Sequence, residues 1–92
     1  MSFPSFTQDP QDRLDYEIDW SEWLPTGDTI ITSTWAVDDA ALTLDDDSAT
    51  TTAATVFASG GVIGSAYLVT NHIETGQGRE KDQTIKIKIR SQ

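Results

Sequence analysis

Acidic and apolar side chains alternate along residues 15–20, near the start of the chain. Tyr16, Ile18 and Trp20 occupy every second position, and carboxylates occupy the positions between them. A period of two is typical of a β-strand with one buried face, because successive side chains of a strand point to opposite sides. This segment therefore predicts a strand that turns its aromatic and aliphatic side chains towards a core.

The same alternation closes the chain, where Ile85, Ile87 and Ile89 alternate with basic residues. Short β-prone segments separated by glycine or aspartate turns lie between these two strands, and apolar residues nowhere recur at helical spacing. The predicted strands span residues 14–20, 29–37, 42–44, 50–58, 66–75 and 83–90. The residues expected in the core are Ile31, Trp35, Val37, Tyr67, Val69, Ile85, Ile87 and Ile89.

This spacing predicts an all-β fold: a single immunoglobulin-like β-sandwich of six to seven short antiparallel strands with an extended N-terminal arm. We expect residues 1–13 to form the arm and residues 14–92 to form the sandwich domain. Pro4 and Pro10 interrupt any strand pairing in the arm, and polar residues dominate it. Tyr67 resembles the tyrosine that anchors a corner of immunoglobulin-like domains through its hydroxyl.

Three aromatic residues are candidate partner contacts. Phe3 and Phe6 stand out in the polar arm, where they either fold back onto the sandwich or dock into a partner. Trp23 follows the end of a predicted strand, where its ring is expected to be partly exposed. By contrast, Trp20 and Trp35 are expected to belong to the core.

The chain has a formal net charge of −9, and twelve of its acidic residues precede Ser48. A mostly acidic surface disfavours binding to nucleic acid. There are two explanations for this charge. It keeps the protein soluble, or it makes the subunit dipolar, so that its acidic end meets the basic end of a neighbour. No stretch is apolar for long enough to span a membrane, no secretion signal is expected, and cysteine is absent. We therefore expect no membrane partner and no disulfide.

The polar residues suggest no catalytic site. Asp15, Glu17 and Asp19 share one face of a strand, but acid–base catalysis needs a cleft that raises one pKa, and an exposed strand face offers none. Asp45–Asp47 form a polar turn whose capacity to bind calcium stays open. His72 is the single histidine and is expected on the surface. We expect no enzyme activity, no catalytic residue, no cofactor and no metal.

Several motifs resemble those of small virion proteins of tailed bacteriophages, known as fiber–tail adaptors or minor structural proteins. The resemblance covers roughly residues 9–90. The motifs are Tyr16-x-Ile18-Asp19-Trp20-Ser21-x-Trp23-Leu24, Gly27-Asp28-Thr29-Ile30, Ser33-Thr34-Trp35-x-Val37, Gly60-Gly61, Gly64-x-x-Tyr67-x-Val69-Thr70-Asn71-x-Ile73-x-Thr75 and Gly78-Arg79. The resemblance implies a β-sandwich subunit of a virion that has a connecting role and no activity.

From these features we expect a non-enzymatic structural component of a bacteriophage virion, assembled in the host cytoplasm, that connects tail or baseplate to fibers. Its expected partners are tail, baseplate or fiber subunits, together with copies of itself in a symmetric assembly. One alternative places it at the head, as a capsid decoration or head–tail joining protein. Another is a carbohydrate-binding module that uses exposed tryptophan and acids against sugar rings.

Overall fold

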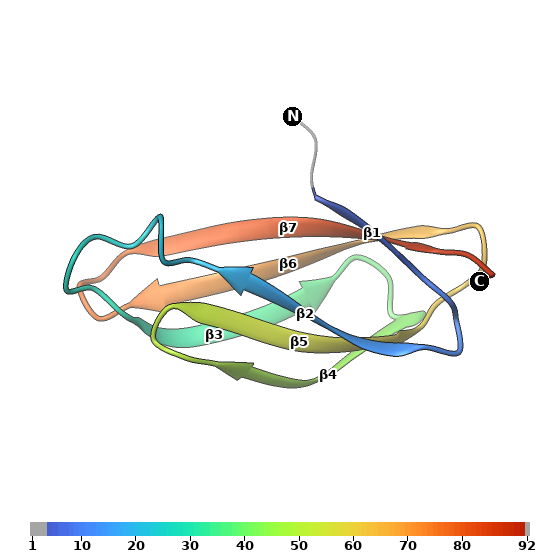
Figure 1. Ribbon diagram of the computed structural model, residues 1–92, viewed down its shortest axis with the longest axis horizontal. Coiled ribbons are helices and arrows are strands. Elements are labelled where there is room, and N and C mark those ends of the chain that lie inside the picture. The colour runs from blue at the N-terminus through green and yellow to red at the C-terminus, as the bar shows by residue number, and fades with distance from the viewer. Residues whose placement is uncertain (1–3, 92) are drawn as a thin grey trace.

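The computed structural model describes residues 4–91, which fold into two β-sheets (Figure 1). The strands are β1 (Ser5–Gln8), β2 (Arg13–Asp19), β3 (Ile30–Val37), β4 (Leu42–Ala49), β5 (Ala53–Gly60), β6 (Ala66–Thr75) and β7 (Glu80–Ile89). None of the described residues forms a helix that could cross a membrane. The predicted all-β sandwich of six to seven strands is confirmed.

One sheet has the strand order β1-β7-β6-β3 and the other the order β2-β5-β4. Neighbouring strands run antiparallel except β1 and β7, where Ser5–Gln8 runs parallel to residues 86–89. The chain changes sheets between β1 and β2, so the first two strands lie at the same open side of the sandwich (Figure 1). The expectation that all strands are antiparallel is therefore wrong for β1.

The prediction that the N-terminal segment forms no strand is also wrong for Ser5–Gln8. Pro4 and Pro10 flank β1 instead of interrupting it, and the Pro4 carbonyl accepts a hydrogen bond of 2.8 Å from the Lys86 N–H. A proline next to a strand costs no ladder bond when its nitrogen is outside the pairing. Whether residues 1–13 behave as an arm separate from residues 14–92 in an assembly stays a prediction.

Gln8 fixes β1 to the opposite sheet. Its side chain is fully buried, and its amide group donates hydrogen bonds to the Ala58 carbonyl at 2.8 Å and the Asp12 carbonyl at 3.1 Å. The Tyr16 hydroxyl donates to Gln8 Oε1 at 2.6 Å. A buried amide is tolerated when its donors and acceptor are satisfied, as they are here. The one buried residue of β1 is thus polar, so the strand shows no alternation of buried apolar residues.

A bulge in β3 overturns the expected position of Ile31 in the core. The pairing with β6 shifts between Ile30 and Thr32, so Ile31 is an extra residue. Such a bulge reverses which side chains face inward. Ile30 is consequently buried and Ile31 is 67% exposed, whereas Trp35 and Val37 keep their predicted side and pack, partly buried, against the core.

The three aspartates expected to form a turn lie inside β4 instead. β4 continues through them because a second bulge, between Asp45 and Ser48, absorbs the irregularity, and Asp46 takes a positive φ of 48°. The Arg13 guanidinium forms ion pairs with Asp45 and Asp46, both at exposed positions. These carboxylates therefore tie the start of β2 to β4 across the second sheet.

The main core lies between the sheets and contains five of the predicted residues, Tyr67, Val69, Ile85, Ile87 and Ile89, each at most 3% exposed. The Tyr67 hydroxyl accepts a hydrogen bond of 2.9 Å from the Val62 N–H, which holds the turn before β6 as the immunoglobulin-like pattern implies. Gly61 fits against this corner because a Cβ there would lie 2.7 Å from Ile89 Cγ1.

Candidate functional site

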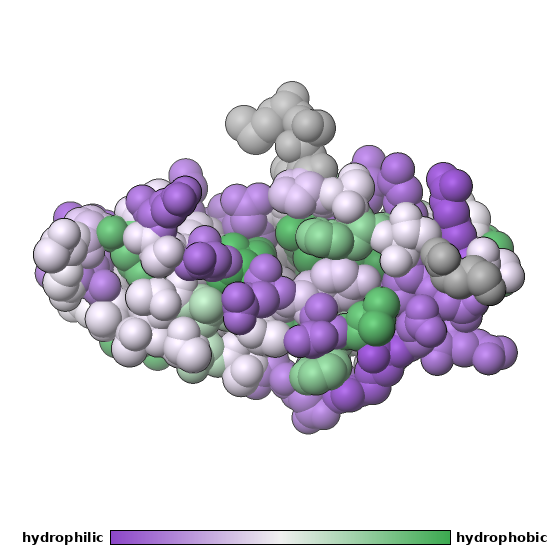
Figure 2. All heavy atoms as spheres, in the orientation of Figure 1, coloured by the Kyte–Doolittle hydropathy of each residue, from purple (hydrophilic) through white to green (hydrophobic). Residues whose placement is uncertain are grey.

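A groove of about 430 Å³ lies at the open side of the sandwich, between β2 and β7. β1, the end of β2, the turn after it and the first half of β7 contribute its lining: Pro4, Phe6, Glu17, Ile18, Asp19, Trp20, Glu22, Trp23, Lys81, Gln83 and Ile85. Figure 2 shows apolar residues between β7 and β2 with hydrophilic residues around them. The groove thus has an apolar floor and a polar rim.

The groove brings together two of the three predicted contact residues. Phe6 is 41% exposed, and its ring packs on Tyr16 with 5.1 Å between ring centroids. Trp23 is partly buried and meets the Trp20 ring edge to face at 5.6 Å. Phe3 lies outside the described residues. That Phe6 and Trp23 contact a partner stays a prediction.

Trp20 positions Trp23 on the groove wall. It is 4% exposed, as expected for a core residue, and its indole N–H donates to Asn71 Oδ1 at 2.9 Å. The Asn71 amide donates in turn to the Ser33 hydroxyl and the Thr34 carbonyl. The Trp20 carbonyl accepts hydrogen bonds from the N–H groups of Trp23 and Leu24, which closes a tight turn. A buried polar network at Trp20 therefore fixes the partly buried ring of Trp23.

Acidic groups outnumber basic ones at the rim, where Glu17, Asp19 and Glu22 face a single cation, Lys81. Asp19 Oδ1 accepts a hydrogen bond of 2.9 Å from the Ser21 N–H. Hydrogen bonding from Ser21 lowers the pKa of Asp19 below its ordinary value. The rim is therefore negative at neutral pH, and it favours a basic group on anything that enters the groove.

Comparison with known proteins identifies the family. A family model described as podophage GP4 fiber-tail adaptor protein gp77 matches residues 8–88. The chain belongs to this family. It is accordingly a structural adaptor of a phage and a component of the virion, as the sequence motifs implied.

A solved structure shares the adaptor's fold. The solution structure of the PKD domain from KIAA 1837 protein matches with a TM-score of 0.58 and 15% sequence identity, over 98% of this chain and 81% of that chain. At this identity the likeness shows the fold alone, an immunoglobulin-like β-sandwich. A sequence search of curated proteins found no match.

An ion pair between Asp28 and Arg79 stabilises the end of the adaptor nearest the β6–β7 turn. The sequence pattern does not predict it. Asp28 is 5% exposed, and its carboxylate accepts hydrogen bonds from the N–H groups of Thr29 and Gln77 and from the Arg79 guanidinium at 3.0 Å. Burial alone raises the pKa of Asp28, but these bonds and one from Thr75 lower it overall. This stabilising role of Asp28 becomes apparent only in the structure, because its partner Arg79 lies 51 positions away in the sequence.

His72 lies on the outer face of the first sheet, at the surface as predicted. Its imidazole contacts the Asp82 carboxylate and lies 3.2 Å from Glu80 Oε1. The hydrogen bond with Asp82 raises the pKa of His72 above its ordinary value. His72, Glu74 and Glu80 also place potential ligand atoms within 4.8 Å of one another. The His72 ring lies between the carboxylates of Glu80 and Asp82 on the neighbouring strand. His72 therefore forms cross-strand ion pairs when it is protonated.

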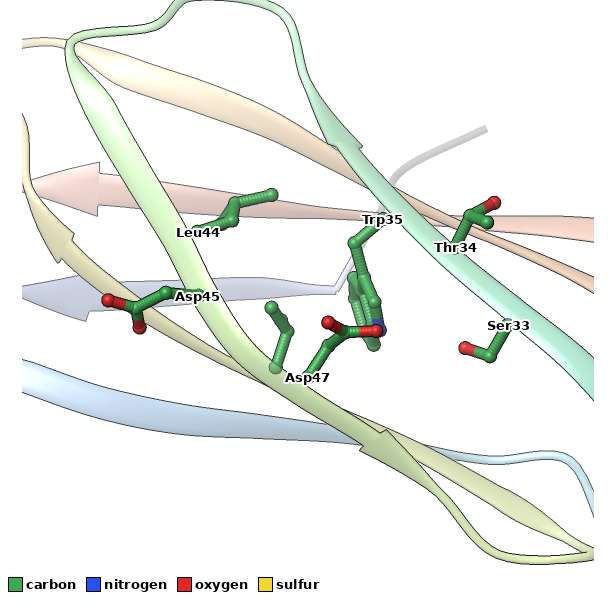
Figure 3. Close-up of a pocket in the computed structure, with 7 residues that line it drawn as sticks. Ser33, Thr34, Trp35, Leu44, Asp45 and Asp47 are labelled. Carbon is green, nitrogen blue, oxygen red and sulfur yellow. The ribbon is translucent and has the colours of Figure 1, made fainter.

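A second pocket, of about 250 Å³, lies at the opposite side of the sandwich, between β3 and β4 (Figure 3). Trp35 from β3 and Asp47 from β4 both line it. The indole N–H of Trp35 is buried and has no hydrogen-bond partner among the described residues. Trp35 thus packs against the core, as expected, but it lies on the edge strand β3 and is only partly buried.

Proposed function

We propose that this adaptor is a non-enzymatic connector that joins the tail or baseplate of the virion to its fibers, and that the groove beside β7 is one of its contact surfaces. The observation that carries the proposal is the meeting of Phe6 and Trp23 in one groove, in a chain whose family is described as fiber-tail adaptor. Aromatic rings that stay at least partly exposed in one groove often mark a binding surface. The partner is another virion subunit, and copies of the adaptor repeat with the symmetry of the particle.

The energetics of the groove suit protein binding. Interfaces gain most of their affinity from a few buried aromatic anchors, each contributing about 2 kcal/mol or more. Trp23 is suited to this role because Trp20 holds its ring in place before any partner arrives. An anchor that is ordered in advance loses little side-chain entropy on binding. The acidic rim then contributes more to the selectivity for a partner than to the affinity of binding.

The carboxylates of β2 support a binding role over a catalytic one. Asp15, Glu17 and Asp19 are exposed along the strand. A general acid needs a pKa raised towards neutrality, whereas the pKa of Asp19 is lowered. The acids instead protect the edge strand β2 from pairing with unrelated chains, as charged edges do.

The test is a double variant, Phe6→Ala with Trp23→Ala, compared with Ile31→Ala as a matched control. Ile31 is a large, exposed apolar residue outside the groove. We expect the double variant to bind purified tail or fiber subunits of the same phage at least about tenfold more weakly, and the control to bind as the unchanged protein does. Calorimetric titration measures the affinities, and electron microscopy shows whether the variant enters particles.

Circular dichroism must first show that the double variant is folded. A folded double variant that binds with unchanged affinity and enters particles normally would exclude the groove as the joint. Unchanged protein that binds no tail or fiber subunit would exclude the connector role itself. Labelled protein found at the head of the particle would favour the alternative role in the capsid or head–tail joint.

A further inference from the structure

One edge of β7 is only half covered. β1 pairs with residues 86–89, so residues 80–85 have no strand on this side among the described residues. The Lys86 N–H donates to the carbonyl of Pro4, just before β1, at 2.8 Å, and the Arg90 N–H donates to the Gln8 carbonyl at 3.0 Å. Backbone groups alternate in direction along a strand, so Asp82 and Thr84 turn their N–H and C=O groups to the same edge. Two residues of β7 thus present an open ladder beside the groove.

Pro4 explains why β1 does not extend along this ladder. Continued parallel pairing would require the nitrogen of residue 4 to donate a hydrogen bond to the Thr84 carbonyl, and proline has no N–H to donate. The Thr84 carbonyl accepts a hydrogen bond of 3.1 Å from the Gln83 side-chain amide instead. Pro4 therefore cannot donate the next bond of the β1–β7 ladder, and no described strand pairs with β7 beyond it on this side.

The groove next to this edge has the features that an added strand requires. An extended peptide that pairs with a sheet edge gains backbone hydrogen bonds, and alternate side chains fill pockets beside it. Phe6, Ile18 and Trp23 offer apolar surface for such side chains. The acidic rim offers a position for a basic one. A helix or a flat surface of a partner would not offer a row of backbone acceptors and donors to the N–H groups of Asp82 and Thr84 and the Asp82 carbonyl.

We propose that an extended segment of a tail or fiber subunit adds a strand to β7 at Asp82 and Thr84. Its alternate apolar side chains pack against Phe6 and Trp23, and a basic side chain meets the acidic rim. This assignment rests on the adaptor function proposed above and names the form of the partner. The charged residues along this part of β7 keep unrelated strands away, because a segment without complementary charge gains too little on pairing.

The test compares Thr84→Pro with Thr84→Val. Both substitutions remove the Thr84 hydroxyl, which lies 2.9 Å from the Thr70 hydroxyl, but only proline removes the N–H at the open edge. Because that N–H faces away from β6, proline leaves the β6–β7 ladder intact. The probes are the purified tail and fiber subunits encoded by the same phage genome. We expect one subunit to bind Thr84→Val with unchanged affinity and Thr84→Pro roughly tenfold more weakly.

Amide hydrogen exchange on the unchanged protein gives an independent measurement, which decides the question even if Thr84→Pro fails to fold. Binding should slow exchange at the amides of Asp82 and Thr84. Binding that leaves both amides unprotected, or equal binding by the two variants, overturns the strand addition and leaves the adaptor function standing. If no subunit binds the unchanged protein, both proposals fail. Protection that grows with the concentration of the adaptor alone would make a second copy the occupant and overturn the choice of partner.

Discussion

The two halves of β7 belong to one strand but have different surroundings. In the second half, Ile85, Ile87 and Ile89 are at most 3% exposed, and strands lie on both sides over residues 86–89. In the first half, residues 80–82 are exposed, and β6 alone pairs with them among the described strands. The difference follows from side-chain composition, since only the isoleucine-rich half can bury a continuous apolar face. One strand thereby belongs to the core at one end and has an edge without a described partner strand at the other.

The largest effect should come from substituting a core residue of the second half. Ile87→Ala removes a fully buried side chain from the main core and should lower the free energy of unfolding by about 2–5 kcal/mol. Lys81→Ala, in the exposed first half, should change it by less than about 0.5 kcal/mol. Chemical denaturation measures both. Similar losses for the two variants would show that the halves do not differ in this way.

A smaller effect should follow from loosening β1. Tyr16→Phe removes the hydroxyl that donates to Gln8 Oε1 and leaves this buried oxygen unpaired, which should cost about 1–3 kcal/mol of stability. Hydrogen exchange should quicken at the Lys86 amide, which bonds to Pro4, more than at the Ile87 amide, which faces β6. Equal acceleration at both amides would mean that β1 and the core open together.

The smallest effect concerns the pH dependence of the first half. Asp82 and Glu80 raise the pKa of His72 above its ordinary value of 6.5, so the folded state binds the imidazole proton more tightly than the unfolded state. The resulting stabilisation is full below pH 6.5 and disappears as the pH rises through the folded-state pKa. His72→Asn should remove this dependence. Melting temperatures of both proteins across this pH range provide the check, and parallel curves would contradict the assignment.

The sequence predicted the second half of β7 better than any other region. The isoleucines alternate there, as Tyr67 and Val69 do in β6. This pattern determines which face of each strand is buried, because a strand with one apolar face must bury that face. The position of Ile31 could not be predicted, since a bulge reverses the facing of side chains without changing the composition of the strand. The sequence does not indicate β1 because its one buried residue, Gln8, is polar and its partner strand lies at the far end of the chain.

The groove was predicted in its parts but not as a whole. The sequence indicates Phe6 and Trp23 separately, each as a large ring in a polar setting. Their meeting depends on the pairing of β1 with β7 and on the turn that follows Trp20, neither of which any local pattern specifies. The charge of the rim could be anticipated from the acids of β2, whereas the open backbone edge beside it follows only from where β1 ends.

The parallel pairing of β1 with β7 has a mechanical consequence for a structural adaptor of a phage particle. Chain enters β1 at Ser5 and leaves β7 at Ile89, so a pull on these two points drives the strands past each other along their length. The hydrogen bonds between them lie across the direction of pull and share the load, because none can break ahead of the rest as in unzipping. We therefore expect this four-residue strand to resist tension better in this shearing geometry than it would if its hydrogen bonds broke one after another.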